Sequence, residues 1–231
     1  MMSERKTIVV LTGAGMSAES GVSTFRDSGG LWENHDIMEV ASPQGFAGNP
    51  ELVLEFYNQR RRQLGTVEPN AGHTGLVELE KQYEVKIITQ NVDDLHERAG
   101  SSDVLHLHGE LYKVRSTCDE TDVKVWKKDL NLGDLCDKGC QLRPHIVWFG
   151  ESVPLLETAV DITMTADIFV VIGTSMQVYP AASLINYVPS GVPIYFIDPR
   201  PTISENAFDQ LTIIPRTATE GVKELLDTLT T

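Results

Sequence analysis

The sequence has few cysteines, few basic residues and no long apolar run. Three cysteines among 231 residues are an odd and low number. This count argues against a disulfide framework and indicates a reducing, cytoplasmic compartment. No stretch approaches the roughly 20 apolar residues that a membrane span needs, so we expect no membrane contact. The apolar run at 8–11 is far too short for a signal peptide, and we expect none.

Basic residues are outnumbered by acidic ones, 19 against 33, which gives a formal net charge of -14. Such a surface repels phosphate backbones, so we expect no nucleic-acid partner. It attracts basic protein segments at long range, although an acidic surface also serves solubility alone. Hydrophobic residues make up 41% of the chain, which suffices for a core without disulfide or metal staples.

Short apolar runs alternate with helix-length segments along most of the chain. The runs are at 8–11, 85–89, 104–106, 167–172, 193–197 and 211–214, and a terminal helix is expected at 220–229. Continuous apolar runs, rather than alternating ones, are typical of parallel strands covered on both faces. The sequence therefore predicts an α/β fold with a doubly wound parallel sheet.

Two regions interrupt this rhythm and predict a small inserted lobe. Residues 28–49 are rich in Gly, Pro and Asn, and 113–146 hold all three cysteines. We assign 1–30, 70–112 and 150–231 to the large part of a single domain, and 31–69 and 113–149 to the lobe. Within the lobe a helix is expected from Pro50 to Leu64, with Asn49 as its cap.

A glycine loop, Gly13-Ala14-Gly15, directly follows the first predicted strand. Its glycines allow a tight turn and let backbone N–H groups approach a pyrophosphate at the start of the next helix, although such a loop is often only a turn. In a dehydrogenase an acidic residue follows about 20 positions later, and Glu33 has that offset. However, the intervening segment carries Arg26 and two aromatic residues and does not resemble a helix plus strand. It favours a lid over the nucleotide and weakens a hydride-transfer interpretation.

Five motifs together resemble the sirtuin family, specifically its bacterial NAD-dependent protein deacylases. They are GAGMSAESGVSTFRDSGGLW at 13–32, TQNVDDLHERAG at 89–100, HGE at 108–110, RPHIVWFGE at 143–151 and GTS at 173–175. They occur in family order and span most of the chain. The resemblance implies a Rossmann-like NAD-binding domain with a small lobe, in agreement with the strand pattern.

The resemblance also implies the reaction and its catalytic residues. Sirtuins cleave NAD and move an acyl group from lysine to ADP-ribose, giving nicotinamide, O-acyl-ADP-ribose and free lysine. His108 would be the general base, because a pKa near 6.5 suits proton removal at neutral pH. His106 would face the same side of a strand, so only the HGE motif and the resemblance favour His108. Asn91 would bond the ribose and a water, and Asp93 the nicotinamide amide, unless this segment is only a polar turn.

An NAD-binding set follows from the same motifs and from loops after the predicted strands. It comprises Gly13, Ala14, Gly15, Ser17, Ala18, Glu19, Thr24, Phe25, Arg26, Trp32, Gln90, Asn91, Asp93, Gly173, Thr174, Ser175, Asp198, Pro199, Arg200 and Ala218. Asp198 stands where many sirtuins have asparagine, and a carboxylate still bonds ribose hydroxyls. Plain turns remain the alternative for the later members.

The resemblance implies a substrate groove at Val147, Trp148, Phe149 and Gly150, where an extended peptide would add as a strand. The alternative is a core strand with both aromatic side chains inside.

Tyr57 and Arg60 lie three residues apart on the predicted helix and hence on one face. They resemble the Tyr-x-x-Arg of the class III subclass that removes succinyl, malonyl and glutaryl groups. A carboxylate-tipped acyl chain needs a charged partner, and Arg60 and the Tyr57 hydroxyl supply donors. The alternative is a solvated basic face.

Most sirtuins hold a structural zinc with four cysteines, but only Cys118, Cys136 and Cys140 are present here. Ser116 and Asp119 occupy the first pair's positions, with Cys118 out of register between them. We therefore expect the lobe to fold without metal. If His145 or Asp119 completed a set, the zinc would be structural.

The main hypothesis is thus a protein-lysine deacylase that removes succinyl, malonyl and acetyl groups, with acylated lysines of proteins as partners. By analogy we expect a monomer. ADP-ribosyl transfer to protein through the same NAD cleavage is the alternative. A non-catalytic NAD sensor would be expected to lose His108 or Asn91, and both are present. A dehydrogenase is the weakest alternative.

Overall fold

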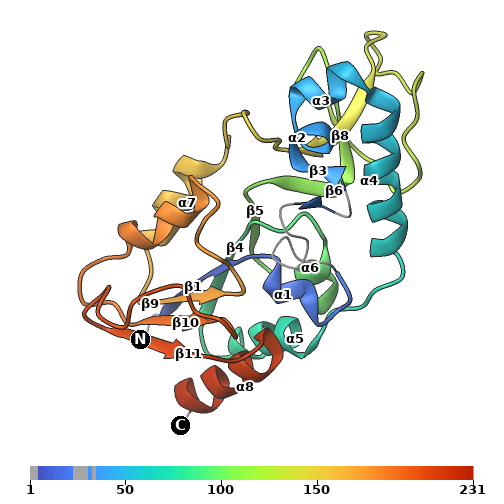
Figure 1. Ribbon diagram of the computed structural model, residues 1–231. Coiled ribbons are helices and arrows are strands. Elements are labelled where there is room, and N and C mark those ends of the chain that lie inside the picture. The colour runs from blue at the N-terminus through green and yellow to red at the C-terminus, as the bar shows by residue number, and fades with distance from the viewer. Residues whose placement is uncertain (1–4, 23–30, 33–34, 231) are drawn as a thin grey trace.

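A six-stranded parallel sheet forms the centre of the protein in this computed structural model, which describes residues 5–22, 31–32 and 35–230. The strand order is β11-β10-β9-β1-β4-β5 (Figure 1). The strands are β1 Thr7–Thr12, β4 Glu84–Thr89, β5 Val104–His106, β9 Ile168–Ile172, β10 Ile194–Ile197 and β11 Leu211–Ile214. All six predicted strands are present. The strand order reverses between β1 and β9, and ligands of doubly wound sheets bind at such a switch point.

Helices cover both faces of this sheet. Helices α5 (Ala71–Leu79) and α8 (Ala218–Leu229) pack on one face with Ile8 and Val10 of β1. The other face carries Val9 and Leu11 under α7 (Leu156–Thr163) and the 3-10 helix η2 (Ala181–Tyr187). Every residue of β1 is buried, which explains its continuous apolar run and confirms the doubly wound fold.

None of the helices in the described ranges is long and apolar enough to cross a membrane.

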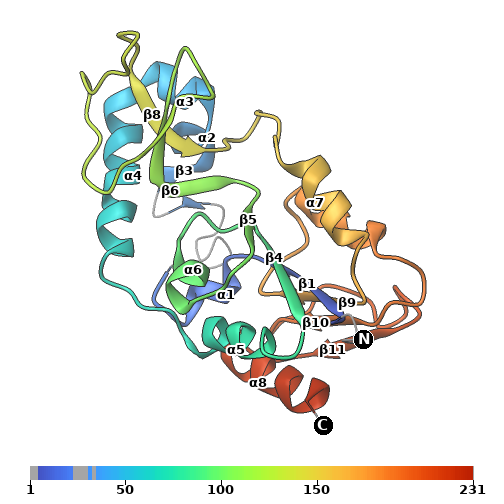
Figure 2. The same cartoon turned by 180° about the vertical axis from the view of Figure 1, so that it is seen from behind.

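A smaller lobe lies beyond the edge of the sheet where α1 (Gly15–Ala18) and α6 (Leu95–Ala99) are found, as Figures 1 and 2 show. Its antiparallel sheet has the order β7-β6-β8, and a short hairpin and three helices complete it. The elements are β6 Gly109–Ser116, β7 Val123–Val125, β8 Leu142–Ile146, β2 Leu31–Trp32, β3 His35–Asp36, α2 Ile37–Val40, α3 Pro43–Gly48 and α4 Pro50–Leu64. The boundary expected between 112 and 113 falls inside β6.

Helix α4 begins where the sequence predicts. The Asn49 side chain accepts a hydrogen bond from Leu52 N at 3.1 Å, and Pro50 is the first helical residue. Its inner face buries Val53, Phe56 and Tyr57 in the core of the lobe. Tyr57 thereby belongs to the interior and not to a solvated face.

The three cysteines meet at one end of this lobe. A single disulfide joins Cys118 to Cys140, although the low cysteine count argued against a disulfide framework. The pairing of Ser116 with Leu142 brings these distant segments together. Cys136 adds a third sulfur, all three lie within 4.8 Å of one another, and Ser116 Oγ donates to Cys136 Sγ at 3.2 Å.

This cluster does not fit the four-ligand zinc site of the family. Two of its sulfurs are bonded to each other and cannot act as thiolate ligands, and a hydroxyl stands in the fourth place. Within the described part of the chain, neither His145 nor Asp119 joins the group. The sequence places Cys118 out of register with the usual ligand positions. In the structure, however, its sulfur lies with those of Cys136 and Cys140.

Candidate active site

The glycine loop after β1 contacts the loop after β9 at the reversal point of the sheet. Gly15 N donates to Gly173 O at 2.8 Å, and Gly13 N donates to Ile172 O at 3.0 Å. A Cβ on Gly15 would lie 2.7 Å from Gly173 Cα, and one on Gly13 would lie 2.8 Å from Thr174 Cβ. These glycines are therefore required for the two loops to meet, in addition to any approach to a nucleotide.

Three predicted site residues form one buried hydrogen-bonded group. Asn91 Nδ2 donates to Ser17 Oγ at 3.1 Å, and Ser17 Oγ donates to Asp93 Oδ2 at 2.9 Å. Leu95 N donates to the other carboxylate oxygen of Asp93 at 3.2 Å. Burial raises the pKa of Asp93, and the bond from Ser17 opposes that rise. The loops after β1 and β4 thus present amide and carboxyl groups at the carboxyl edge of the sheet.

The two candidate histidines differ in their partners. Both ring nitrogens of His106 are engaged, Nδ1 with Asn91 O at 3.1 Å and Nε2 with Glu97 Oε1 at 2.7 Å. His108 Nδ1 lies 3.1 Å from Gln90 O, and no described residue bonds its Nε2. When Nδ1 donates to this carbonyl, Nε2 of the neutral ring is an acceptor. Of these two rings, His108 is therefore the one with a ring nitrogen, Nε2, that no described residue engages.

Other predicted NAD contacts lie at the same edge. Gln90 Nε2 donates to Thr174 Oγ1 at 3.1 Å, which links the loops after β4 and β9. Asp198 is buried directly after β10, and its Oδ1 accepts from Arg200 N at 2.8 Å across Pro199. The neighbouring Ser175, Ala14 and Ala18 are on the loops or helix already described.

Glu19 bonds the first turn of α8, the helix that begins at Ala218. The Glu19 carboxylate accepts from Thr219 N at 3.0 Å and from Thr219 Oγ1 at 2.7 Å. A carboxylate there is favoured by the N-terminal end of the helix dipole. In this structure the Glu19 carboxylate therefore holds the N-terminus of α8 next to the glycine loop by two hydrogen bonds. Thr24, Phe25 and Arg26 lie outside the described residues, as does the side chain of Trp32.

Asn70, His73 and His96 support the site and were not predicted. Asn70 caps α5 through Gly72 N at 2.9 Å and donates to Met16 O at 2.8 Å, which anchors α1. The Asn-x-x-His spacing of this capping box was the available sequence signal. The rings of His73 and His96 meet edge to face, with centroids 4.9 Å apart.

His96 connects this support to Asn91. Its Nε2 lies 3.1 Å from Thr12 Oγ1, which donates to Thr89 Oγ1 at 2.8 Å. Asn91 N in turn donates to Thr89 Oγ1 at 3.0 Å. The orientation of the Asn91 backbone thus depends on a buried polar chain that a sequence pattern does not reveal.

The buried histidine pair predicts a specific acid sensitivity. Burial lowers the pKa of His73 to about 4, below the roughly 6.5 expected in the unfolded chain. The unfolded state then binds protons first, so stability is complete above pH 6.5 and is lost as the pH falls toward 4. We expect His73→Gln, which keeps the capping box, to reduce the loss in unfolding free energy between pH 7 and 5 by about 2 kcal/mol. Urea unfolding at the two pH values measures this, and an equal loss in both proteins contradicts it.

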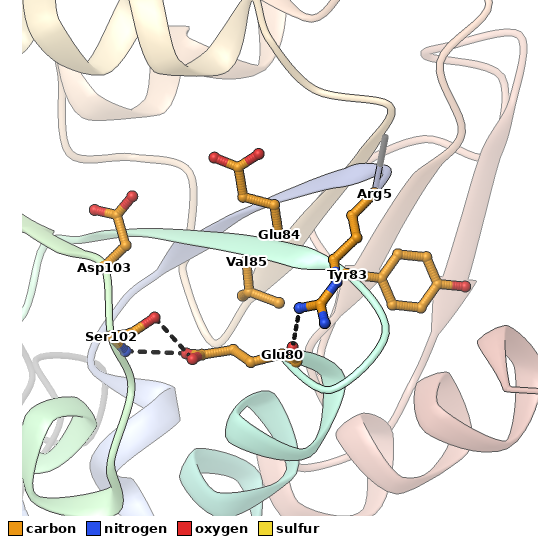
Figure 3. A pocket seen from close by; sticks show the side chains of 7 residues that line it. All are labelled: Arg5, Glu80, Tyr83, Glu84, Val85, Ser102 and Asp103. Atoms are coloured by element: carbon orange, nitrogen blue, oxygen red, sulfur yellow. Dashed lines mark hydrogen bonds between the residues drawn. The ribbon is translucent and has the colours of Figure 1, made fainter. Parts of the chain in front are cut away.

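A hollow of about 430 Å³ lies at the opposite edge of the sheet and is separate from the site (Figure 3). Its walls come from the amino ends of β1, β4 and β5 and the turn after α5. Its lining residues are Arg5, Glu80, Tyr83, Glu84, Val85, Ser102 and Asp103. Ligands of open α/β sheets bind at the carboxyl ends of strands, so size alone does not make this hollow the active site.

The predicted peptide segment follows β8 and is a turn, not a strand. Val147 N donates to His108 O, and Phe149 N donates to Ala41 O, both at 2.9 Å. Trp148 is 2% exposed and packs in the lobe core, whereas Phe149 is 43% exposed next to Gly150. Of the alternative, a core strand with both aromatic side chains inside, only the inward position of Trp148 is found.

Tyr57 of α4 contacts this segment, and Arg60 lies about one turn further along the same helix. Tyr57 Oη accepts from Trp148 Nε1 at 2.9 Å. The Arg60 guanidinium lies 3.3 Å from the ring centroid of Phe56, and its Nη1 donates to Phe56 O at 2.7 Å. Arg60 is thus held against an aromatic ring and is not a fully solvated base.

Comparison with known proteins identifies the family. The Sir2 family model matches residues 13–180. The chain belongs to the Sir2 family. An NAD-dependent protein deacylase of Helicobacter pylori is 64% identical over 195 residues, covering 84% of this chain and 83% of that protein. One from Bacteroides thetaiotaomicron is 54% identical over 226 residues, covering 95% and 96%. The sirtuin resemblance is confirmed.

Solved structures of Sir2 proteins share the fold of this family member. A Sir2 homologue–NAD complex is 42% identical with a TM-score of 0.86, covering 97% of this chain and 90% of that one. A Sir2 mutant with a p53 peptide and NAD is 28% identical with a TM-score of 0.80, covering 97% and 94%. The predicted Rossmann-like architecture is confirmed.

Proposed function

We propose that this Sir2 protein is an NAD-dependent protein-lysine deacylase that prefers acyl groups ending in a carboxylate. The deacylase activity is supported by the relatives named as such and by a Sir2 homologue that binds NAD. The observation that carries it here is His108, whose Nε2 faces no protein partner in the described residues, beside the buried Asn91–Ser17–Asp93 group.

These residues match the needs of acyl transfer to ADP-ribose. Gln90 O orients the His108 ring, so that Nε2 can accept a proton from a ribose hydroxyl as that oxygen attacks the acyl group. Asn91 is held by Ser17 and offers its remaining amide groups to the ribose and to a water. Asp93 is also bonded to Ser17, and its role in the proposal is to bond the nicotinamide amide. The bond from the acyl carbon to the lysine nitrogen breaks and one water is consumed, so the products are nicotinamide, O-acyl-ADP-ribose and free lysine.

The acyl preference rests on Tyr57 and Arg60. A carboxylate that enters an apolar lobe loses its hydration and needs charged donors in compensation. Arg60 supplies a planar fork of donors that is fixed by the Phe56 ring, and Tyr57 supplies a hydroxyl from the same helix. Succinyl and malonyl groups carry such a carboxylate, whereas acetyl does not.

A panel of matched peptides tests this function. The protein is incubated with NAD and acetyl-, succinyl- or malonyl-lysine peptides of one sequence, and products are followed by mass spectrometry. We expect kcat/KM for the acidic peptides to exceed that for the acetyl peptide by about 10-fold or more, since a charge-assisted hydrogen bond contributes about 1.5–3 kcal/mol. Reaction of the acetyl peptide alone would refute the acyl preference. Nicotinamide release without free lysine would instead indicate ADP-ribosyl transfer or NAD hydrolysis.

A further inference from the structure

Trp148 connects Tyr57 to a buried group of charges that the reaction itself does not use. Its indole nitrogen donates to Tyr57 Oη at 2.9 Å, and both side chains are buried. An indole nitrogen can only donate, so this bond occupies a lone pair of the phenol oxygen and does not use the phenol proton. The indole thereby fixes which side of the hydroxyl accepts and restricts the directions in which it can donate.

The position of Trp148 is itself determined by two charged residues. Its backbone N donates to Glu151 Oε2 at 2.8 Å. The Arg143 guanidinium lies 3.4 Å from the centroid of the indole ring, a close cation–π contact. Arg143 is in turn bonded to Glu151 Oε1 at 2.6 Å and to Ile146 O at 3.0 Å. Rotation of the indole would therefore break its contact with the Arg143 guanidinium, which Glu151 and Ile146 O hold in place.

These charges do not cancel. Arg115 Nη2 also donates to both oxygens of Glu151, each at 3.1 Å, so two guanidinium groups share one carboxylate. Their side chains are only 7% and 10% exposed, which limits screening by water. Burial raises the pKa of Tyr57, and the charge of Glu151 adds to the rise, while the Trp148 bond and the charges of Arg60 and Arg143 oppose it. The Trp148 indole joins Arg143 to this hydroxyl, because its ring contacts the guanidinium and its N–H bonds the phenol oxygen.

We propose that Trp148 and Arg143 are positioning residues for acidic acyl groups. The indole directs the Tyr57 hydroxyl so that it donates to the acyl carboxylate, and the surplus guanidinium charge behind the indole favours an anion at that place. The proposal rests on the proposed preference for carboxylate-tipped acyl groups. A neutral acetyl group uses neither effect, so loss of the arrangement changes the ratio between substrates.

A double-mutant cycle tests the connection between the two residues. Trp148→Phe keeps an aromatic ring for Arg143 to stack on but removes the N–H donor, and Tyr57→Phe removes its acceptor. The readout is kcat/KM for succinyl peptide divided by kcat/KM for acetyl peptide. We expect Trp148→Phe to lower this ratio by about 10-fold, mainly through the KM of the succinyl peptide, and to cause no further fall in the Tyr57→Phe background.

Two control variants separate a positioning role of Trp148 from a general effect of losing an indole on the fold of the lobe. Trp126→Phe removes another indole donor of the lobe, which bonds Asp129 O at 3.0 Å, and should leave the ratio as in the wild type. If Trp148→Phe does not fold, Arg143→Lys, which keeps the charge but loses the planar stack, should lower the ratio in its place. Equal loss for both peptides, or a further fall in the Tyr57→Phe background, would overturn the positioning role. A wild-type protein without succinyl activity would instead refute the proposed function.

Discussion

Replacement of His108 by alanine is expected to lower kcat/KM for deacylation by about 10²–10⁴-fold, the usual contribution of a positioned general base. The imidazole is the group at the carboxyl edge of the sheet that combines an oriented Nδ1 with an Nε2 not bonded to any described residue. Without it, the ribose hydroxyl must lose its proton to water during attack. Steady-state assays at saturating NAD with one acyl-lysine peptide measure the effect.

His106 provides the matched control, because it lies two residues away and both of its nitrogens are engaged by Asn91 O and Glu97. His106→Gln should therefore reduce activity far less than His108→Ala. Burial lowers the pKa of His108, so its neutral, proton-accepting form persists below pH 6.5. The acidic limb of kcat/KM should accordingly fall below that pH. A larger loss of kcat/KM in the His106 variant would indicate that His106, and not His108, is the general base.

Strand positions were predictable because burial on both faces leaves a continuous apolar run. The β1 and β9 runs are fully buried, and each is followed directly by a glycine loop. Two such loops at adjacent carboxyl ends are enough to place a nucleotide site from sequence. The motifs after β4 could likewise be placed, since Asn91 and Asp93 come directly after an apolar run of the same kind.

Side-chain partners were not predictable from the same patterns. His106 and His108 are alike in sequence, and only the positions of Glu97 and Gln90 separate them. Trp148 and Phe149 are adjacent aromatic residues with opposite exposure, because the chain turns after β8 instead of continuing as a strand. The meeting of Cys118 with Cys140 depends on strand pairing between distant segments, which cysteine counting cannot anticipate.

Substitution of Arg60 by methionine should lower kcat/KM for succinyl and malonyl peptides relative to acetyl peptide by about 100-fold. Loss of one partner from a buried, hydrogen-bonded charge pair costs about 2–5 kcal/mol, and 100-fold corresponds to about 2.7 kcal/mol. Methionine keeps much of the apolar volume that packs against Phe56, so the change mainly removes charge. The measurement is the same peptide panel, with acyl groups compared on one peptide sequence.

Arg62→Met is the matched control on the same helix. Arg62 is 51% exposed and is paired with Glu55 and Asp129, so its loss removes one positive charge from α4 without reaching the lobe interior. If the Arg62 variant changed the acyl preference as much as the Arg60 variant, the preference would arise from the total positive charge of α4 and not from one guanidinium. A ratio that falls only in the Arg60 variant would assign the carboxylate to that guanidinium. A ratio unchanged in both would leave the Tyr57 hydroxyl and the Arg143 charge, which Trp148 joins, as the sources of selectivity to test next.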